Sequence, residues 1–134
     1  MKVVVDASVA VKWFADEPLF DRARALQQHS LAAPDLIFAE VANVMWKLWR
    51  KGVLTDAHYA VRGESLKDAP LVVTPVRDLL ASAMRLAREL DHPVYDCFYL
   101  ALAVREGCPA IPADQRFAAA VAGHPYLSKF VEKL

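Results

Sequence analysis

Four acidic residues, spread over the sequence, are the side chains most able to do chemistry. Asp6 and Asp114 each follow a short apolar run that predicts a β-strand, and each precedes a predicted helix. In open α/β sheets, ligands bind beyond the carboxyl ends of the strands, so both carboxylates are expected at one binding edge. An aspartate in such a position also serves as a helix cap, and the sequence leaves both interpretations open.

Asp96 stands in the first turn of a predicted helix, residues 94–106, whose surface is apolar on almost every side. Its favourable interaction with the helix dipole is worth only about 0.3–1 kcal/mol. Burial of a charge without a partner costs several kcal/mol, which exceeds that gain. Asp96 is therefore expected to face a polar cleft, a cation, or both.

Glu40 lies near the start of another predicted helix, over residues 36–51, on a narrow polar stripe that also holds Asn43 and Lys47. A solvated helix face with charge pairs would explain this stripe without any chemistry. In the alternative interpretation, Glu40 points into the same cleft as Asp6 and brings a further carboxylate to it.

The apolar arc of the same helix is wider than core packing alone usually requires, and it includes Trp46 and Trp49. Core packing, a homodimer contact and a groove for a helix of a partner protein all remain open for the two tryptophans. The excess of apolar surface favours a partner over solvent.

Convergence of the acidic residues would have a chemical consequence. Two carboxylates about 5 Å apart repel each other by roughly 3 kcal/mol at an effective dielectric constant of 20, so a cluster of four must take up protons or bind cations. Oxygen ligands without cysteine or paired histidine favour Mg²⁺ or Mn²⁺ over zinc. Such ions activate a water molecule and stabilise a leaving oxygen, which is the chemistry of phosphodiester hydrolysis.

The elements that must position these residues alternate between strands and helices, which predicts an α/β domain around a parallel sheet. The expected strands cover residues 2–5, 71–74 and 109–111. The expected helices cover residues 9–14 with Ser8 as the cap, 19–28, 36–51, 55–68 begun by Thr55, 75–90, 94–106 and 117–121. Helix 75–90 is expected to turn inward the residues Leu79, Leu80, Ala83, Leu86, Ala87 and Leu90. The length of 134 residues predicts a single domain, residues 1–134.

The composition excludes several classes of protein. Hydrophobic residues make up 56% and charged residues 24% of the chain, which is too apolar for a disordered protein. No apolar stretch approaches the ~20 residues of a membrane span, and Asp6 and Lys12 interrupt any signal-peptide pattern, so a cytoplasmic protein is expected. Sixteen basic and sixteen acidic residues cancel, so affinity for phosphate must be local. Cys97 and Cys108 are expected to be free, buried thiols.

Four segments together match a known pattern: residues 3–8, residues 34–36 with Glu40 and Asn43, residues 95–103, and residues 113–117. They resemble the PIN-domain nucleases, and the small size of the chain is similar to the VapC toxins of toxin–antitoxin pairs. The segment 95–103 is the most specific of the four. Two positions depart from the family: Pro112 stands where threonine is common, and Ala118 stands where some relatives have a further acidic residue.

The resemblance implies a three-layer α/β/α sandwich with a central, mainly parallel sheet. It implies four catalytic acidic residues: Asp6, Glu40, Asp96 and Asp114. Of these, Asp6, Asp96 and Asp114 would hold Mg²⁺, for which Mn²⁺ can substitute, and Ser8 and Asn43 would support them. The implied activity is cleavage of RNA by an endoribonuclease toxin that a VapB-like antitoxin neutralises. From the residues themselves, Lys47 and Arg116 are candidates for contact with RNA phosphate, and a homodimer that binds no membrane is expected.

Other functions remain open. A PIN-type nuclease could serve RNA maturation, and a non-catalytic module could use the acidic cleft to hold a metal ion or a basic peptide. A ribonuclease without metal would use two histidines as general acid and base. The histidines, His29, His58, His92 and His124, are scattered and are expected at the surface.

Overall fold

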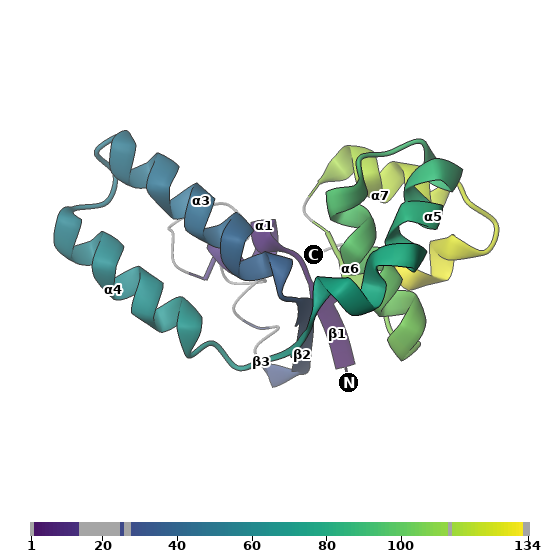
Figure 1. The fold of residues 1–134 in the computed structure, drawn as a ribbon, viewed down its shortest axis with the longest axis horizontal. Helices are drawn as coiled ribbons and strands as arrows, with labels where there is room; N and C mark the ends of the chain where they lie inside the picture. Colours follow the sequence, from purple (N-terminus) through teal and green to yellow (C-terminus); the bar gives the residue numbers. More distant parts are fainter. Residues whose placement is uncertain (1, 14–24, 26–27, 113, 133–134) are drawn as a thin grey trace.

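The computed structural model describes residues 2–13, 25, 28–112 and 114–132 (Figure 1). Within these residues, a sheet of parallel strands has the order β3-β2-β1-β4. The strands are β1 (Lys2–Val5), β2 (Ser30–Pro34), β3 (Leu71–Thr74) and β4 (Ala110–Ile111). Because the strands are parallel, their carboxyl ends share one edge of the sheet, and Asp6 and Asp114 follow two of them.

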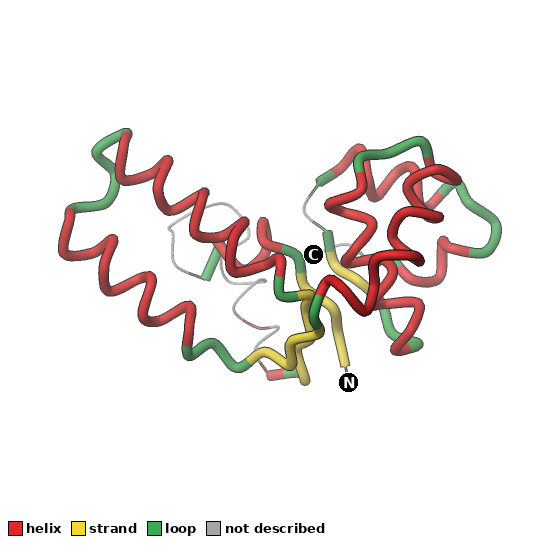
Figure 2. Tube along the Cα trace, in the orientation of Figure 1, coloured by secondary structure: helices red, strands yellow, loops and turns green. Residues whose placement is uncertain are grey.

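Helices lie on both sides of the sheet (Figures 1 and 2). One side holds α1 (Ala7–Val11), α3 (Leu36–Arg50) and α4 (Asp56–Lys67), and the other holds α5 (Leu80–Leu90), α6 (Val94–Glu106) and α7 (Gln115–Ala122). The 3-10 helices η2 (Val76–Leu79) and η3 (Leu127–Phe130) precede α5 and follow α7. This arrangement confirms the predicted α/β class with a parallel sheet.

The core forms where α6 packs on the two inner strands. Val3, Val4 and Val5 of β1 are completely buried, because β1 has a strand on each side and helices on both faces. Residues 97–103 of α6 are all buried, as its apolar circumference predicts. Cys97 and Cys108 are buried free thiols, which confirms the prediction for both.

The strand β2 is absent from the sequence-based prediction. Its residues, Ser-Leu-Ala-Ala-Pro, contain no β-branched or aromatic side chain, so the local pattern carries no strand signal. The extended conformation is stabilised instead by hydrogen bonding to β1 on one side and β3 on the other. This strand positions α3, which begins two residues after it ends.

The predicted cap of the first helix is wrong. The helix α1 begins at Ala7, and Asp6 is its cap: the backbone N–H of Val9 donates a hydrogen bond to Asp6 Oδ1 at 3.0 Å. The backbone of Asp6 is extended, as a capping residue requires, whereas Ser8 is already helical and exposed.

The predicted inward face of residues 75–90 is wrong at Leu80, which is 48% exposed while Leu79 is buried. The segment is a 3-10 turn followed by an α-helix, so one helical period does not describe it. Thr55 begins α4 as predicted. The helix predicted over residues 19–28 falls mainly on residues outside the described part of the chain. Among the described residues, no helix combines the length and apolar character that a membrane crossing requires.

Candidate metal centre

The carboxyl edge of the sheet brings together acidic side chains that are far apart in the sequence. Asp6, which follows β1, and Asp96, in the first turn of α6, both line a cavity of about 10 Å³ together with Tyr99 and Pro112. A volume of this size is close to the minimum that holds one water molecule. Glu40 of α3 reaches the same place, because Tyr99 Oη donates a hydrogen bond to its Oε1 at 2.6 Å.

The inner side of the site consists of Asp6, Glu40 and Tyr99. Asp6 is only 6% exposed, and its carboxylate caps α1 while it lines the cavity. The capping role and the cleft position, which are alternatives in the sequence, are therefore both present in one residue. Tyr99 is 3% exposed, so its hydroxyl needs a partner inside the protein, and Glu40 supplies it.

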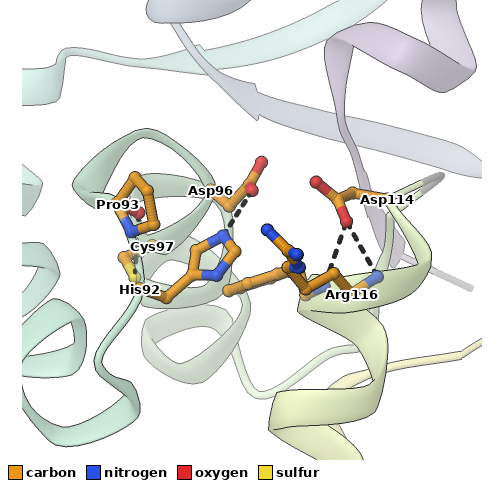
Figure 3. Close-up of polar contacts among 7 residues, drawn as sticks. His92, Pro93, Asp96, Cys97, Asp114 and Arg116 are labelled. Carbon is orange, nitrogen blue, oxygen red and sulfur yellow. Dashed lines mark hydrogen bonds and ion pairs between the residues drawn. The ribbon is translucent and has the colours of Figure 1, made fainter.

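The outer side of the site consists of His92, Asp96 and Asp114. His92 Nε2 lies 2.8 Å from Asp96 Oδ2, and one donor atom from each of the three residues lies within 4.8 Å of the other two. Figure 3 shows the carboxylates of Asp96 and Asp114 pointing toward each other from α6 and from the start of α7. Asp114 Oδ1 also caps α7, because it accepts hydrogen bonds from the backbone N–H groups of Arg116 and Phe117.

The electrostatics of the site reflect this concentration of negative charge. Burial raises the pKa of Glu40, the hydrogen bond from Tyr99 opposes that rise, and the charge of Asp96 adds to it. Burial also raises the pKa of Tyr99, and so do its interactions with Glu40, Asp6 and Asp96. Glu40, Asp6 and Asp96 thus all act in the same direction on the pKa of Tyr99, as expected for carboxylates that lie near one hydroxyl group. A cation placed among them would relieve this repulsion.

The residues present fit a divalent cation. Carboxylate oxygens approach from Asp6, Glu40, Asp96 and Asp114, and an imidazole nitrogen approaches from His92. A compact set of oxygen donors suits Mg²⁺ or Mn²⁺. Among the described residues, His92, Asp96 and Asp114 form a group whose donor atoms lie within 4.8 Å of one another, and Asp6 lines the small cavity together with Asp96.

The other residues predicted for the site are exposed residues on the helices that carry the acidic residues or follow them. Asn43 and Lys47 are exposed on α3, three and seven positions after Glu40 and therefore on the same helix face. Arg116 is exposed at the start of α7, and Figure 3 shows its side chain directed toward His92 and Asp96. Ser8 is exposed on α1, two residues after Asp6.

Two residues of the site are not singled out by the sequence reasoning. His92 was expected at the surface, and this is wrong, because its side chain is only 9% exposed and contacts Asp96. His92 lies before the Pro93 cap and therefore outside α6, so helical spacing does not predict its contact with Asp96. Tyr99 does offer a signal, because a hydroxyl on an otherwise apolar helix predicts a buried polar partner.

Known proteins with similar sequences include PIN-domain ribonucleases. The family model described as "PIN domain" matches residues 3–122. The chain is 34% identical to "Ribonuclease VapC3" of Pyrobaculum aerophilum over 122 residues, which cover 88% of this chain and 93% of that protein.

Solved structures with low sequence identity share the fold. Mycobacterium tuberculosis VapC20, described as a "Sarcin-Ricin loop cleaving toxin", superposes with a TM-score of 0.67 at 19% identity, covering 88% of this chain and 94% of that one. A "Toxin-antitoxin complex" from Klebsiella pneumoniae also gives a TM-score of 0.67, at 16% identity, covering 97% of this chain and 95% of that one. These likenesses confirm the predicted three-layer α/β/α fold with a central parallel sheet.

Proposed function

The chain belongs to the PIN-domain family, and on that premise we propose that it is a divalent-metal-dependent endoribonuclease that acts as the toxin of a toxin–antitoxin pair. The observation that carries the proposal is the convergence of Asp6, Glu40, Asp96 and Asp114 at one edge of the sheet. The family match over residues 3–122 supports one PIN-like domain over residues 1–134. The free thiols Cys97 and Cys108 are typical of the reducing cytoplasm, where we place the activity.

The chemistry follows from what each side chain does. A divalent cation, Mg²⁺ or Mn²⁺ in its place, would make a water molecule more acidic and would neutralise charge on the phosphate. Asp6, Asp96 and Asp114 would hold this cation. Glu40 is kept in place by the hydroxyl of Tyr99, and its raised pKa suits it to accept a proton from the attacking water.

RNA reaches the site over a surface with local positive charge. Lys47 is exposed on α3, seven positions after Glu40, and the Arg116 side chain is directed toward His92 and Asp96; both are proposed to contact phosphate groups on either side of the scissile bond. Asn43, on the same helix face as Glu40, and Ser8, beside Asp6, support the acidic residues. Because the net charge of the chain is zero, removal of either positive charge should weaken RNA binding noticeably.

The test is cleavage of structured RNA by the purified protein with Mg²⁺, with Mn²⁺ and with EDTA. We expect cleavage that requires the metal and leaves a 3′-hydroxyl and a 5′-phosphate. A 2′,3′-cyclic phosphate would indicate histidine catalysis instead. Metal binding without cleavage would indicate a non-catalytic module, and cleavage without growth arrest on expression would indicate a nuclease of RNA maturation.

A VapB-like antitoxin is proposed to bind at the α3–α4 hairpin. Trp46 and Trp49 are each 40% exposed there, and a pocket of about 280 Å³ is lined by Phe38 and Leu66. An amphipathic helix or an extended apolar segment would cover this surface. The fold that this chain shares with a toxin–antitoxin complex supports such a partner. Co-expression with a small gene immediately upstream should yield a stable complex that no longer cleaves RNA.

A second copy of the chain is proposed to cover the other large apolar surface. A groove of about 1070 Å³ follows α5 and the start of α6, where Leu80 is 48% and Met84 is 56% exposed. Patches of this kind are unusual on monomeric proteins. Sedimentation should show a dimer, and Met84→Asp should convert it to a monomer. A monomeric wild type would contradict the proposal.

A further inference from the structure

We infer that His92 is a nitrogen ligand of the cation, together with Asp96 and Asp114, and that it shifts the preference of the site away from Mg²⁺ and toward Mn²⁺ or Co²⁺. This inference rests on the proposed function, since it concerns the same centre. It adds His92 to the ligand set expected from the sequence, which consists of Asp6, Asp96 and Asp114.

The spacing of the donor atoms supports shared coordination. Two ligands that are each about 2.1 Å from one ion lie about 3.0 Å apart when adjacent and about 4.2 Å apart when opposite. His92 Nε2 and Asp96 Oδ2 are 2.8 Å apart, close to the adjacent spacing. The Asp114 donor lies within 4.8 Å of both, and this spacing would shorten when the three side chains bind one ion.

The surroundings of His92 hold its ring where a ligand must be. Asp91, in the left-handed conformation at φ 50°, ends α5, and Pro93 then caps α6, so His92 is fixed in a tight turn between two helices. Its backbone N–H donates a hydrogen bond to the Ala87 carbonyl at 3.1 Å. Its ring packs on Phe117 with a centroid distance of 4.7 Å. A side chain held on these sides loses little entropy when it binds an ion.

The imidazole nitrogen of His92 discriminates between Mg²⁺ and transition-metal ions. Mg²⁺ binds oxygen and retains several water molecules, so it gains little from an imidazole. First-row transition ions accept nitrogen ligands more readily, and their affinities rise along the series from Mn²⁺ to Co²⁺. His92 should therefore increase the ratio of Mn²⁺ to Mg²⁺ affinity. A carboxylate in its place would increase both affinities.

The test is the electron spin-echo modulation spectrum of Mn²⁺ bound to the full chain without RNA. A directly coordinated imidazole should give strong ¹⁴N modulation in the wild type and none in His92→Gln. The same variant should bind Mn²⁺ about tenfold or more weakly, with less than a threefold change for Mg²⁺. The control is His58→Gln, which changes an exposed histidine of α4 and should leave spectrum and affinities as in the wild type.

Several results would overturn the inference: no nitrogen modulation in the wild type, modulation that persists in His92→Gln, or an unchanged ratio of affinities. If His92→Gln does not fold, the combined variant His29→Gln, His58→Gln and His124→Gln retains His92 alone and must keep the modulation. Cleavage of RNA without nitrogen modulation would leave the proposed function intact and refute the role of His92. Nitrogen modulation without any cleavage of RNA would support His92 as a ligand and refute the proposed function.

Discussion

The helices α4 and α6 are close in length, with 12 and 13 residues, but they differ in almost everything else. Residues 97–103 of α6 are all buried, whereas α4 buries Leu66 and leaves Tyr59 and Val61 exposed. In Figure 1, α4 forms a hairpin with α3 that extends away from the sheet, and α6 lies against β1. We infer that α6 is a rigid support for the site, whereas the hairpin of α3 and α4 provides a surface that can adapt to a partner.

The reason for this division is the precision that each task requires. A metal ligand must be held within about 0.5 Å. The proposed ligand Asp96 begins a helix whose residues 97–103 are all buried, which gives it a rigid support. A surface that receives a partner gains from the ability to repack. The hairpin is held by local contacts, such as the hydrogen bond from Trp49 Nε1 to Asp56 Oδ1 at 2.7 Å. Perturbations of α6 should therefore affect chemistry and global stability, and perturbations of α4 should remain local.

The largest expected effect is that of Asp96→Asn on RNA cleavage. The substitution keeps the size of the side chain but removes the charge of a proposed metal ligand, so the rate should fall about 100-fold or more. The free energy of unfolding should change by less than about 1 kcal/mol. The matched control is Asp56→Asn on α4, which keeps an oxygen for Trp49 and should leave cleavage unchanged. Full activity of Asp96→Asn would remove α6 from the chemistry.

Truncation of one buried leucine in each helix tests the difference in packing. Leu100 of α6 is completely buried, so Leu100→Ala should lower the free energy of unfolding by about 3–5 kcal/mol. Leu66 of α4 borders the 280 Å³ pocket, where neighbours can relax, so Leu66→Ala should cost about 2 kcal/mol or less. Denaturant unfolding with unchanged m-values measures both. Equal losses would show that α4 belongs to the same cooperative core.

The same two helices show how far the sequence leads. The periodicity of residues 94–106 alone predicts α6 and its burial. Because this helix is apolar on almost every side, the periodicity also predicts that the carboxylate of Asp96 faces a polar cleft or a cation. Thr55 likewise predicts the start of α4. The local pattern places Asp6 and Asp114 at strand ends, but the cap of α1 is Asp6 and not the predicted Ser8.

The remainder depends on tertiary context that no local pattern carries. The strand β2 is extended because β1 and β3 pair with it, and its own residues do not favour that state. His92 reaches Asp96 because Asp91 adopts a left-handed conformation, which redirects the chain between α5 and α6. The hydrogen bond between Tyr99 and Glu40 joins residues 59 positions apart, so it too follows only from the assembled fold.

A smaller and local effect is expected for Trp49→Phe. The variant retains a ring that can pack on Tyr59, whose centroid lies 6.0 Å away, but it loses the donor to Asp56. The loss should be about 1 kcal/mol, and faster amide exchange should be confined to α3 and α4. Exchange in α6 serves as the internal control. Faster exchange in both helices would show that they open together and would abolish the distinction between them.

The smallest effect has the opposite sign. Burial raises the pKa of Glu40, so the folded protein binds a proton there more tightly than the unfolded chain does. The charged form therefore destabilises the fold at neutral pH, and this loss disappears as the pH falls below the pKa of the folded state. Glu40→Gln, whose amide oxygen can still accept from Tyr99, should be about 0.5–1 kcal/mol more stable at pH 7 while losing cleavage activity. The difference in stability should vanish near pH 4.

The control for this prediction is Glu64→Gln, which changes an exposed carboxylate of α4 and should alter neither the free energy of unfolding nor the cleavage activity. If Glu64→Gln stabilised the protein as much as Glu40→Gln, burial of the Glu40 carboxylate would not be the cause of the gain in stability.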